Sequence, residues 1–304
     1  MKKNFTKCMR MAMLTMLVMI MSMVSAFAED SGVNWEKGVI TVEGTGVANP
    51  RALTPLQGRL GARLAAKADA QRQLLEIIKG VNVDAETTVE NLMLTSDVIT
   101  TRVSGVLTGA RIVDEKEISG GYIVTMQMPI YGMTNSVASA VLPHDTAQPQ
   151  PYPEPVPSVA PSQTSIHVDI SVPPSSAQTP IPQTPTAQKA PAGKAYGKYT
   201  GLIVDCRGLG LKPVMSPVIK NANGESIYGH KNLDYDRVVS NGMAGYTTDM
   251  SRATRAGSNP LVVRAISLDN HNGNPVLSLA DANRVLIENA VSGFLDQTNV
   301  VFVR

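Results

Sequence analysis

Residues 55–80 read PLQGRLGARLAAKADAQRQLLEIIKG. At 100° per residue, the apolar side chains fall on one stripe of a helix and most charged ones fall on the opposite side. The predicted apolar stripe consists of Leu60, Leu64, Ala68, Leu74, Leu75 and Ile78. Five alanines between residues 62 and 70 favour helix and keep the packing distance short. Gly80 is a typical residue to end it. We therefore predict a long amphipathic helix that needs a sheet or another helix to cover it.

The segments around this helix predict a compact α+β domain with the order βαβαββ over residues 37–142. The other predicted elements are strands at 38–48, 81–89, 109–118 and 122–129 and a second helix at 91–105. Gly44-Thr45-Gly46 should break or bulge the first strand, and Thr95-Ser96-Asp97 could interrupt the second helix. The two glycines imitate a dinucleotide-binding loop, but Asn49 stands where its third glycine belongs. The pattern therefore argues against a nucleotide cofactor.

Residues 143–198 differ sharply in composition from the rest of the chain. Thirteen of the 20 prolines lie here, separated by Ser, Thr, Gln and Ala. Such a segment buries too little apolar surface to fold, so we predict a disordered, extended linker. One alternating apolar run interrupts it, formed by Ile166, Val168, Ile170 and Val172. This run is either a docking strand for the edge of a partner's sheet or a chance apolar patch.

Residues 199–304 predict a second α+β domain. A near-continuous apolar run at 200–207 is typical of a buried strand, and Asn223-Gly224 marks the turn of a hairpin. Further strands are expected at 261–266 and 300–303. Ser278, with Asp281 three residues later, predicts the start of a helix. The fold class is thus two small α+β domains joined by a proline-rich linker.

The first 28 residues predict a cleaved signal peptide. A basic start is followed by an apolar run at 11–24 and by Ala26-Phe27-Ala28, a typical cleavage site. No cysteine follows the apolar run, so we expect an exported protein without a lipid anchor and with no membrane span after cleavage. Removing these residues takes away four of the 27 basic residues and none of the 25 acidic ones, which changes the formal net charge from +2 to −2. Nothing then indicates nucleic-acid binding.

The chain offers little that could carry chemistry. Its histidines, His144, His167, His230 and His271, have no metal-ligand spacing, so we expect no metal site. Cys206 would be the only cysteine left after cleavage, and it is expected to be a buried small residue. A catalytic alternative places Cys206 between Asp205 and Arg207 at a strand end, with His230 or His271 as the base. We favour a structural ion pair between Asp205 and Arg207 and predict no enzyme activity.

Residues 38–130 carry a set of motifs with family character. They comprise Gly44-Thr45-Gly46-Val47-Ala48, Ala65-x-x-Ala68-Asp69-Ala70-x-Arg72-x-Leu74-Leu75-Glu76, Gly80-Val81-x-Val83, Thr87-x-Val89, Val103-x-Gly105-x-x-x-Gly109-Ala110 and Gly121-Tyr122-x-Val124. On these motifs the domain resembles the twenty-kilodalton lipoprotein (LPP) family and the N-terminal domain of the flagellar assembly protein FlgT. The resemblance implies an envelope- or flagellum-associated protein without an established active site. Read from spacing alone, Asp69, Arg72 and Glu76 can pair along the exposed side of the helix.

These observations predict an exported, non-enzymatic assembly or scaffold protein of the cell envelope, with a flagellar role as one option. The alternative is an envelope protein that binds a ligand or polymer through its C-terminal domain. A hydrolase that uses Cys206 is the third reading. The expected partners are envelope proteins or a second copy, reached by strand addition through the run at 166–172, and no cofactor is expected.

Overall fold

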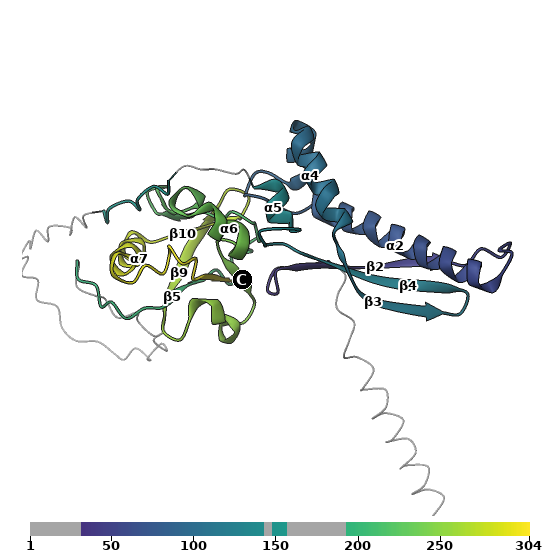
Figure 1. Cartoon of the computed structure of the whole chain (residues 1–304). Coiled ribbons are helices and arrows are strands. Elements are labelled where there is room, and N and C mark those ends of the chain that lie inside the picture. Colours follow the sequence, from purple (N-terminus) through teal and green to yellow (C-terminus); the bar gives the residue numbers. More distant parts are fainter. Residues whose placement is uncertain (1–31, 143–147, 157–192) are drawn as a thin grey trace, which may run out of the picture.

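The structure is a computed structural model that describes residues 32–142, 148–156 and 193–304. The predicted signal peptide at 1–28 and the predicted docking run at 166–172 lie outside the described residues. The described chain forms two α+β domains that follow one another along the long axis of the molecule (Figure 1). The predicted fold class is confirmed.

The first domain is a four-stranded antiparallel sheet with a long helix across one face (Figure 1). Its elements are β1 (Gly32–Asn34), β2 (Val39–Val47), α2 (Pro55–Lys79), α3 (Val89–Thr95), α4 (Asp97–Thr108), β3 (Arg111–Ile118), β4 (Gly121–Pro129) and α5 (Val137–Val141). The strand order is β1-β2-β4-β3. Helix α2 spans the predicted residues, with Thr54 as its N-cap and Gly80 as its C-cap.

Local predictions in this domain are confirmed in part. The second helix is interrupted at Ser96, whose hydroxyl accepts a hydrogen bond from Ile99 N and caps α4. The strand expected at 81–89 is wrong, because only an isolated bridge joins Asn82 and Thr88. The break expected at Gly44-Thr45-Gly46 is also wrong, since β2 pairs with β4 continuously as far as Val47.

The glycines of β2 instead allow α2 to lie unusually close to the strand. A Cβ atom added to Gly44 would lie 2.7 Å from the Cα atom of Ala70, and one added to Gly46 would lie 2.5 Å from the backbone nitrogen of Ala66. Real Cβ atoms do not approach other atoms so closely, so any larger residue would push the helix away. The glycines therefore set the distance between helix and sheet.

This close approach also sets the rotation of α2 about its axis. The buried face consists of Gly58, Ala62, Ala66, Ala70, Leu74 and Ile78. The predicted stripe is therefore wrong in the first half of the helix, where Leu60 and Leu64 are 53% and 65% exposed. Leucine side chains do not fit between backbones in such close contact, whereas alanine does. Ala68 was also predicted on this stripe and is exposed, so the prediction is wrong there too. It is confirmed only near the end of the helix, where Leu74 and Ile78 are fully buried and Leu75 is partly buried against the core.

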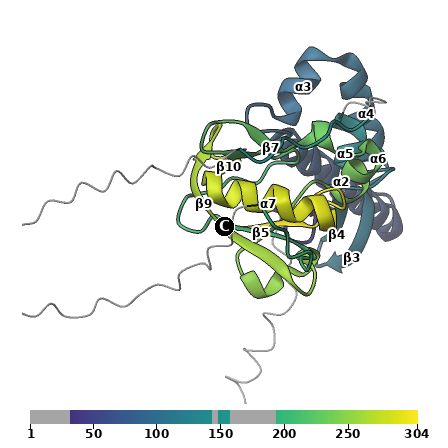
Figure 2. The ribbon, with the colours of Figure 1, turned by 90° about the vertical axis from the view of Figure 1, so that its left-hand side faces the viewer.

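The C-terminal domain is a mixed seven-stranded sheet with the order β7-β6-β10-β9-β5-β11-β8. Its strands are β5 (Gly201–Asp205), β6 (Ile219–Asn221), β7 (Ser226–Tyr228), β8 (Gly245–Thr247), β9 (Pro260–Asp269), β10 (Asn274–Leu277) and β11 (Val300–Val303). Its helices are η1 (His230–Asn232), α6 (Tyr235–Asn241), η2 (Met250–Arg252), η3 (Thr254–Ala256) and α7 (Leu279–Ser292). Helix α7 packs over one face of the sheet (Figure 2).

Most elements of this domain follow the sequence predictions. Strands β6 and β7 form the predicted hairpin, and the Ser278 hydroxyl accepts a hydrogen bond from Asp281 N to cap α7. Strand β10 has no counterpart among the predicted elements, and it forms an antiparallel pair with β9. The sequence does not predict this strand because it contains Pro275, and proline is depleted in strands.

The two domains share a continuous seam rather than a loose junction. Backbone amides of Met215 and Ser216 donate to the carbonyl oxygens of Asn82 and Val83, at 3.0 and 2.7 Å. In the turn between β1 and β2, the ring of Trp35 packs edge-on against Tyr246 with centroids 5.6 Å apart. Buried side chains of both domains belong to one hydrophobic core. The molecule is therefore held as a single body with an extended first domain.

The described flanks of the predicted linker lie on the C-terminal domain. Val156 exchanges two backbone hydrogen bonds with the side chain of Asn283 on α7, at 2.8 and 2.7 Å. On the other flank, the backbone amides of Tyr196 and Gly197 donate to the buried carboxylate of Glu288, also on α7. Residues 148–156 and 193–198 are thus part of the folded body. The linker between 143 and 198 stays a prediction, since most of it lies outside the described residues.

Replacing Gly44 with alanine should separate α2 from β2, because the new Cβ atom would meet the helix backbone. We expect the free energy of unfolding to fall by about 3 kcal/mol or more, at the upper end of overpacking costs. Gly61→Ala is the matched control on the same helix, since nothing lies within 4 Å of an added Cβ there. That variant should be about 0.5–1 kcal/mol more stable. Urea denaturation measures both, and equal effects would contradict the close contact.

Cutting the chain between the two described flanks should not separate the domains. We propose inserting a site-specific protease sequence between Ser176 and Ala177. Because the seam and the contacts of Val156 hold the N-terminal fragment, both fragments should co-elute in native size-exclusion chromatography and separate only in urea. Separate elution in native buffer would show that the seam is too weak to hold the domains together.

Candidate interaction surface

Four leucines protrude at the end of the first domain that lies farthest from the C-terminal domain. Leu53 is 90% exposed in the loop before α2, and three leucines follow on the helix at intervals of four residues. These are Leu56, Leu60 and Leu64, with exposed fractions of 57%, 53% and 65%. We call these four leucines the distal surface. Clustered exposed leucines on a soluble domain are typical of an interaction site.

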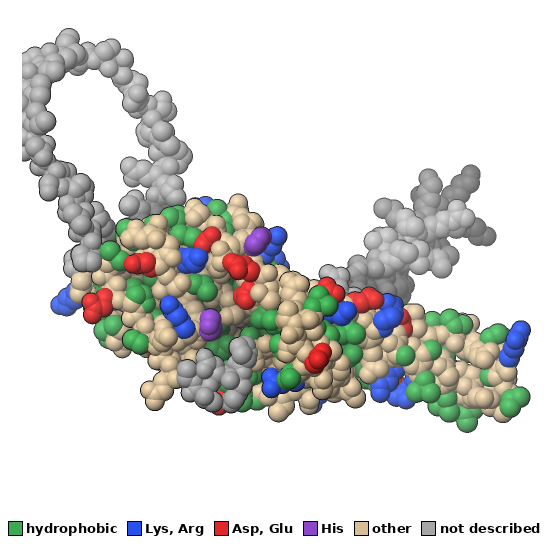
Figure 3. Space-filling view, turned by 90° about the horizontal axis from the view of Figure 1, so that it is seen from above, with side chains coloured by type: hydrophobic (Ala, Val, Ile, Leu, Met, Phe, Trp, Pro, Cys, Tyr) green, Lys and Arg blue, Asp and Glu red, His purple; other side chains and the backbone are tan. Residues whose placement is uncertain are grey.

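Basic side chains accompany the leucines. The stretch 44–68 contains Arg51, Arg59, Arg63 and Lys67 and no aspartate or glutamate. Figure 3 shows hydrophobic and basic side chains together over this end of the molecule. The guanidinium of Arg63 donates to both carboxylate oxygens of Glu115 on β3, at 2.8 and 2.6 Å, and these contacts lower the pKa of Glu115. Arg59 lies 3.9 Å from Glu117 on the same strand.

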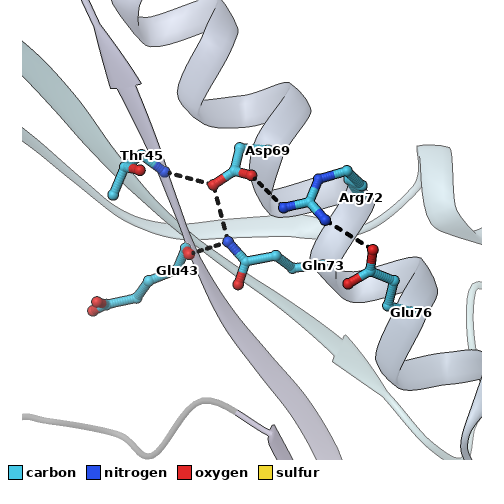
Figure 4. A network of polar contacts seen from close by, with 6 residues as sticks. All are labelled: Glu43, Thr45, Asp69, Arg72, Gln73 and Glu76. Atoms are coloured by element: carbon cyan, nitrogen blue, oxygen red, sulfur yellow. Dashed lines mark hydrogen bonds and ion pairs between the residues drawn. The ribbon is translucent and has the colours of Figure 1, made fainter.

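A polar network next to this surface ties α2 to β2 (Figure 4). The carboxylate of Asp69 accepts a hydrogen bond from the backbone amide of Thr45 at 3.0 Å. Gln73 Nε2 donates a hydrogen bond to the carbonyl oxygen of Glu43 at 2.9 Å. Strand β1 pairs with β2 only as far as Thr41, so Glu43 and Thr45 lie on an open edge. Side chains of α2 therefore take the place of a neighbouring strand along this edge.

The predicted pairing of Asp69, Arg72 and Glu76 along the helix is present. Arg72 lies 2.9 Å from Asp69 and 2.8 Å from Glu76. The hydrogen bond from Thr45 N is the main cause that lowers the pKa of Asp69, and Arg72 adds to it. Helical spacing could not show the contact with β2, because it joins residues 24 positions apart.

The other edge of the first sheet, β3, is built in a way that discourages pairing. Its register with β4 shifts at Val113, which forms a bulge. The following residues, Asp114, Glu115, Lys116 and Glu117, are all charged. Bulges and charges are the usual protection of an edge strand. Strand addition through Ile166, Val168, Ile170 and Val172 stays a prediction, and the described edges do not favour it.

The predicted catalytic alternative does not come together around Cys206. Asp205 and Arg207 form the expected ion pair, at 2.7 Å. Cys206 is fully buried, and this burial, with a smaller contribution from Asp205, raises the pKa of its thiol to about 12. Among the described residues, its side chain has no hydrogen bond to His230 or His271. In the same part of the chain, no group of His, Cys, Asp and Glu could hold a metal ion.

A cavity of about 460 Å³ lies at the seam between the domains. Its walls come from the loop at 83–86, from α6 and from turns of the C-terminal sheet. Polar side chains that reach it include Asp84, Glu86, Ser216, His230, Lys231 and Asn270. Sequence reasoning missed this cavity, since its residues are far apart in the chain and follow no motif.

Comparison with known families matches both domains. Residues 45–128 match the LPP20 lipoprotein family, a range that covers α2 to β4. The first domain is therefore similar to this lipoprotein family over most of its length. Residues 201–304 match the second domain of Treponema pallidum Tp0624. No curated protein matches the chain. The predicted LPP resemblance is confirmed, while the likeness to the FlgT domain stays a prediction.

The LPP20 domain indicates an envelope-associated, lipoprotein-like protein. Within the described residues, we find no helix of the length and apolar character needed to cross a bilayer. For the C-terminal domain, the comparison shows a similarity to the second domain of Tp0624 that no motif in the sequence indicates.

Replacing Asp69 with asparagine should weaken the attachment of α2 to β2. We expect a loss of about 1 kcal/mol at neutral pH, the size of a net hydrogen bond on a partly exposed group. Because folding lowers the pKa of Asp69, the stability it contributes is present above the ordinary value of 3.8 and is lost as the pH falls below it.

The stability difference between wild type and Asp69→Asn should therefore shrink as the pH falls below 3.8. Glu76→Gln is the control, since Glu76 pairs only with Arg72 on the helix surface and should change stability by a few tenths of a kcal/mol at most, about the value of a helix ion pair. Thermal melts over a pH series measure both variants. A difference that stays constant down to acid pH would contradict the role of the carboxylate.

Proposed function

We propose that this protein is an exported, non-enzymatic scaffold protein of the cell envelope that binds its partner through the distal surface. The observation that carries the proposal is the cluster of four exposed leucines on an LPP20 domain. Exposing these leucines to water is unfavourable, and burying them against a partner would recover that free energy.

The shape of the molecule supports a scaffold role. The seam joins the two domains through backbone hydrogen bonds and a shared core, so the first domain extends from the C-terminal domain as a fixed arm (Figure 1). The distal surface lies at the free end of this arm. A partner bound there is held at a set distance from whatever the C-terminal domain contacts.

The state of Cys206 supports the non-enzymatic reading. A nucleophilic cysteine needs an accessible thiolate and a neighbouring base. Here the thiol is buried and its raised pKa keeps it protonated at neutral pH. The Cys206→Ser variant should accordingly keep whatever binding the wild type shows.

A flagellar role is the finer hypothesis that the FlgT likeness suggests. It makes a distinct prediction about genomic context, because flagellar genes should then neighbour the gene. Neighbouring polysaccharide or transport genes would instead favour the reading as a ligand- or polymer-binding protein.

The cavity at the seam supports ligand binding as a second candidate function. Its volume of about 460 Å³ is in the range of small-molecule sites, and such sites are common between domains. It also brings carboxylates, Lys231 and His230 together with apolar walls. A soluble envelope ligand that raises the melting temperature of the wild type but not of Lys231→Ala would identify it as a binding site.

Fractionation of expressing cells tests the scaffold function. Replacing Leu56, Leu60 and Leu64 with serine should move the protein from the envelope fraction to the soluble exported fraction. The matched control is Leu94→Ser with Val98→Ser, an exposed apolar pair on α3 and α4 outside the distal surface. The control should fractionate like the wild type. Unchanged fractionation of the distal variant would contradict the proposed role of this surface.

A further inference from the structure

We infer that the distal surface binds directly to an anionic phospholipid bilayer. This inference rests on the proposed function and names the partner class for the same surface. It concerns the four leucines together with the basic residues of the stretch 44–68.

The shape of the surface fits a bilayer better than a protein pocket. Leu53 stands at the tip of the arm with 90% of its surface exposed, and Leu56 follows it at the first turn of α2. The three best-formed cavities of the described residues are not lined by any of the four leucines. Each of the four has more than half of its surface exposed to solvent. Protruding apolar side chains can enter a fluid interface that adapts to them.

The charge around the leucines selects anionic headgroups. Arg51 lies two residues before Leu53, and Lys67 lies three residues after Leu64. Within the described residues, neither side chain lies within ion-pair distance of a carboxylate, because Glu117 and Glu115 are paired with Arg59 and Arg63. Lys67 acts on Glu115 only at longer range, where its charge adds to the lowering of the pKa of Glu115. Basic residues near a bilayer surface each add to binding of anionic lipids. Their long side chains can keep the charge at the headgroups while their alkyl parts lie against the apolar layer.

The two carboxylates nearest the surface do not cancel this charge. Glu115 and Glu117 are already engaged, by Arg63 and Arg59. These four groups are neutral as two pairs. Of the remaining charges, the three cations Arg51, Lys67 and Lys116 outnumber the one exposed carboxylate of Asp114 on β3. The end is therefore cationic as a whole and apolar in its most exposed residues, the combination typical of interfacial anchors.

The same charges argue against a second copy as the occupant. A two-fold symmetric dimer would bring the same surface patch of both copies together, and with it the cations of both. The apolar patch itself exposes on the order of 500 Å², whereas a stable interface needs about 800 Å² from each partner. An anionic bilayer carries the opposite charge and therefore attracts these cations. A small apolar patch can also insert into it, because binding to a bilayer requires no minimum interface area.

Vesicle co-sedimentation tests the inference with purified components. The full chain is purified from the exported fraction and mixed with vesicles of equimolar phosphatidylglycerol and phosphatidylethanolamine, or with vesicles of phosphatidylcholine alone. We expect binding to the anionic vesicles, weaker binding at high salt, and little binding to the neutral ones. Leu53→Ser with Leu56→Ser should weaken binding by about tenfold or more, since apolar burial sets much of the affinity. Leu94→Ser with Val98→Ser is the matched control and should bind like the wild type.

A fluorescent label reports insertion without removing the apolar surface. A polarity-sensitive dye on Leu53→Cys should shift to shorter wavelength with anionic vesicles, while the same dye on Leu94→Cys should not. Cys206 is buried and should not be labelled in the folded protein. Circular dichroism checks that each variant keeps the fold.

The outcomes separate this inference from the proposed function. One outcome is that the variant with Leu56, Leu60 and Leu64 replaced leaves the envelope fraction in cells while the wild type does not bind anionic vesicles. In that case the partner is a protein and the lipid inference is wrong. If the wild type binds neutral and anionic vesicles equally, the charge argument is wrong. If wild type forms a dimer that the leucine substitutions abolish, and does not bind vesicles, a second copy is the occupant and the inference is overturned.

Discussion

The close packing of α2 on β2 is the contact on which the rest of the first domain depends. Gly44 and Gly46 leave no side chain between helix and strand, and the alanines at 62, 66 and 70 complete the contact. Once the alanine face is committed to the sheet, Leu60 and Leu64 must point to solvent. The same proximity brings Asp69 and Gln73 within hydrogen-bonding distance of the β2 edge. Fold stability and the exposed apolar surface thus have one physical origin.

The sequence predicted the elements of this protein better than their contacts. The ends of α2, the cap at Ser278 and the hairpin at Asn223-Gly224 depend on neighbouring residues, and these predictions are confirmed. The rotation of α2 depends on Gly44 and Gly46, some 20 residues away, so an average over apolar periodicity could not reveal it. Leucines outweigh alanines in such an average, which is why Leu60 and Leu64 were assigned to the core. The candidate surface was therefore present in the sequence but was placed on the wrong side of the helix.

The seam adds a second level of organisation that no local pattern indicates. Its hydrogen bonds join the loop after α2 to the segment before β6, and its aromatic contact joins Trp35 to Tyr246. With the flanks at Val156 and Tyr196 held by α7, the long proline-rich stretch begins and ends on one helix of the C-terminal domain. The two domains are therefore coupled by packing, and the position of the distal surface relative to the C-terminal domain is fixed by that packing.

Carbene labelling of the full chain in solution, read at single residues by mass spectrometry, tests the central claim most directly. The claim is that small residues of α2 face the sheet while its first leucines face water. The account predicts strong labelling of Leu56, Leu60 and Leu64 and protection of Ala62 and Ala66. Protected leucines with labelled alanines would contradict it, because the helix would then present its leucine stripe to the sheet.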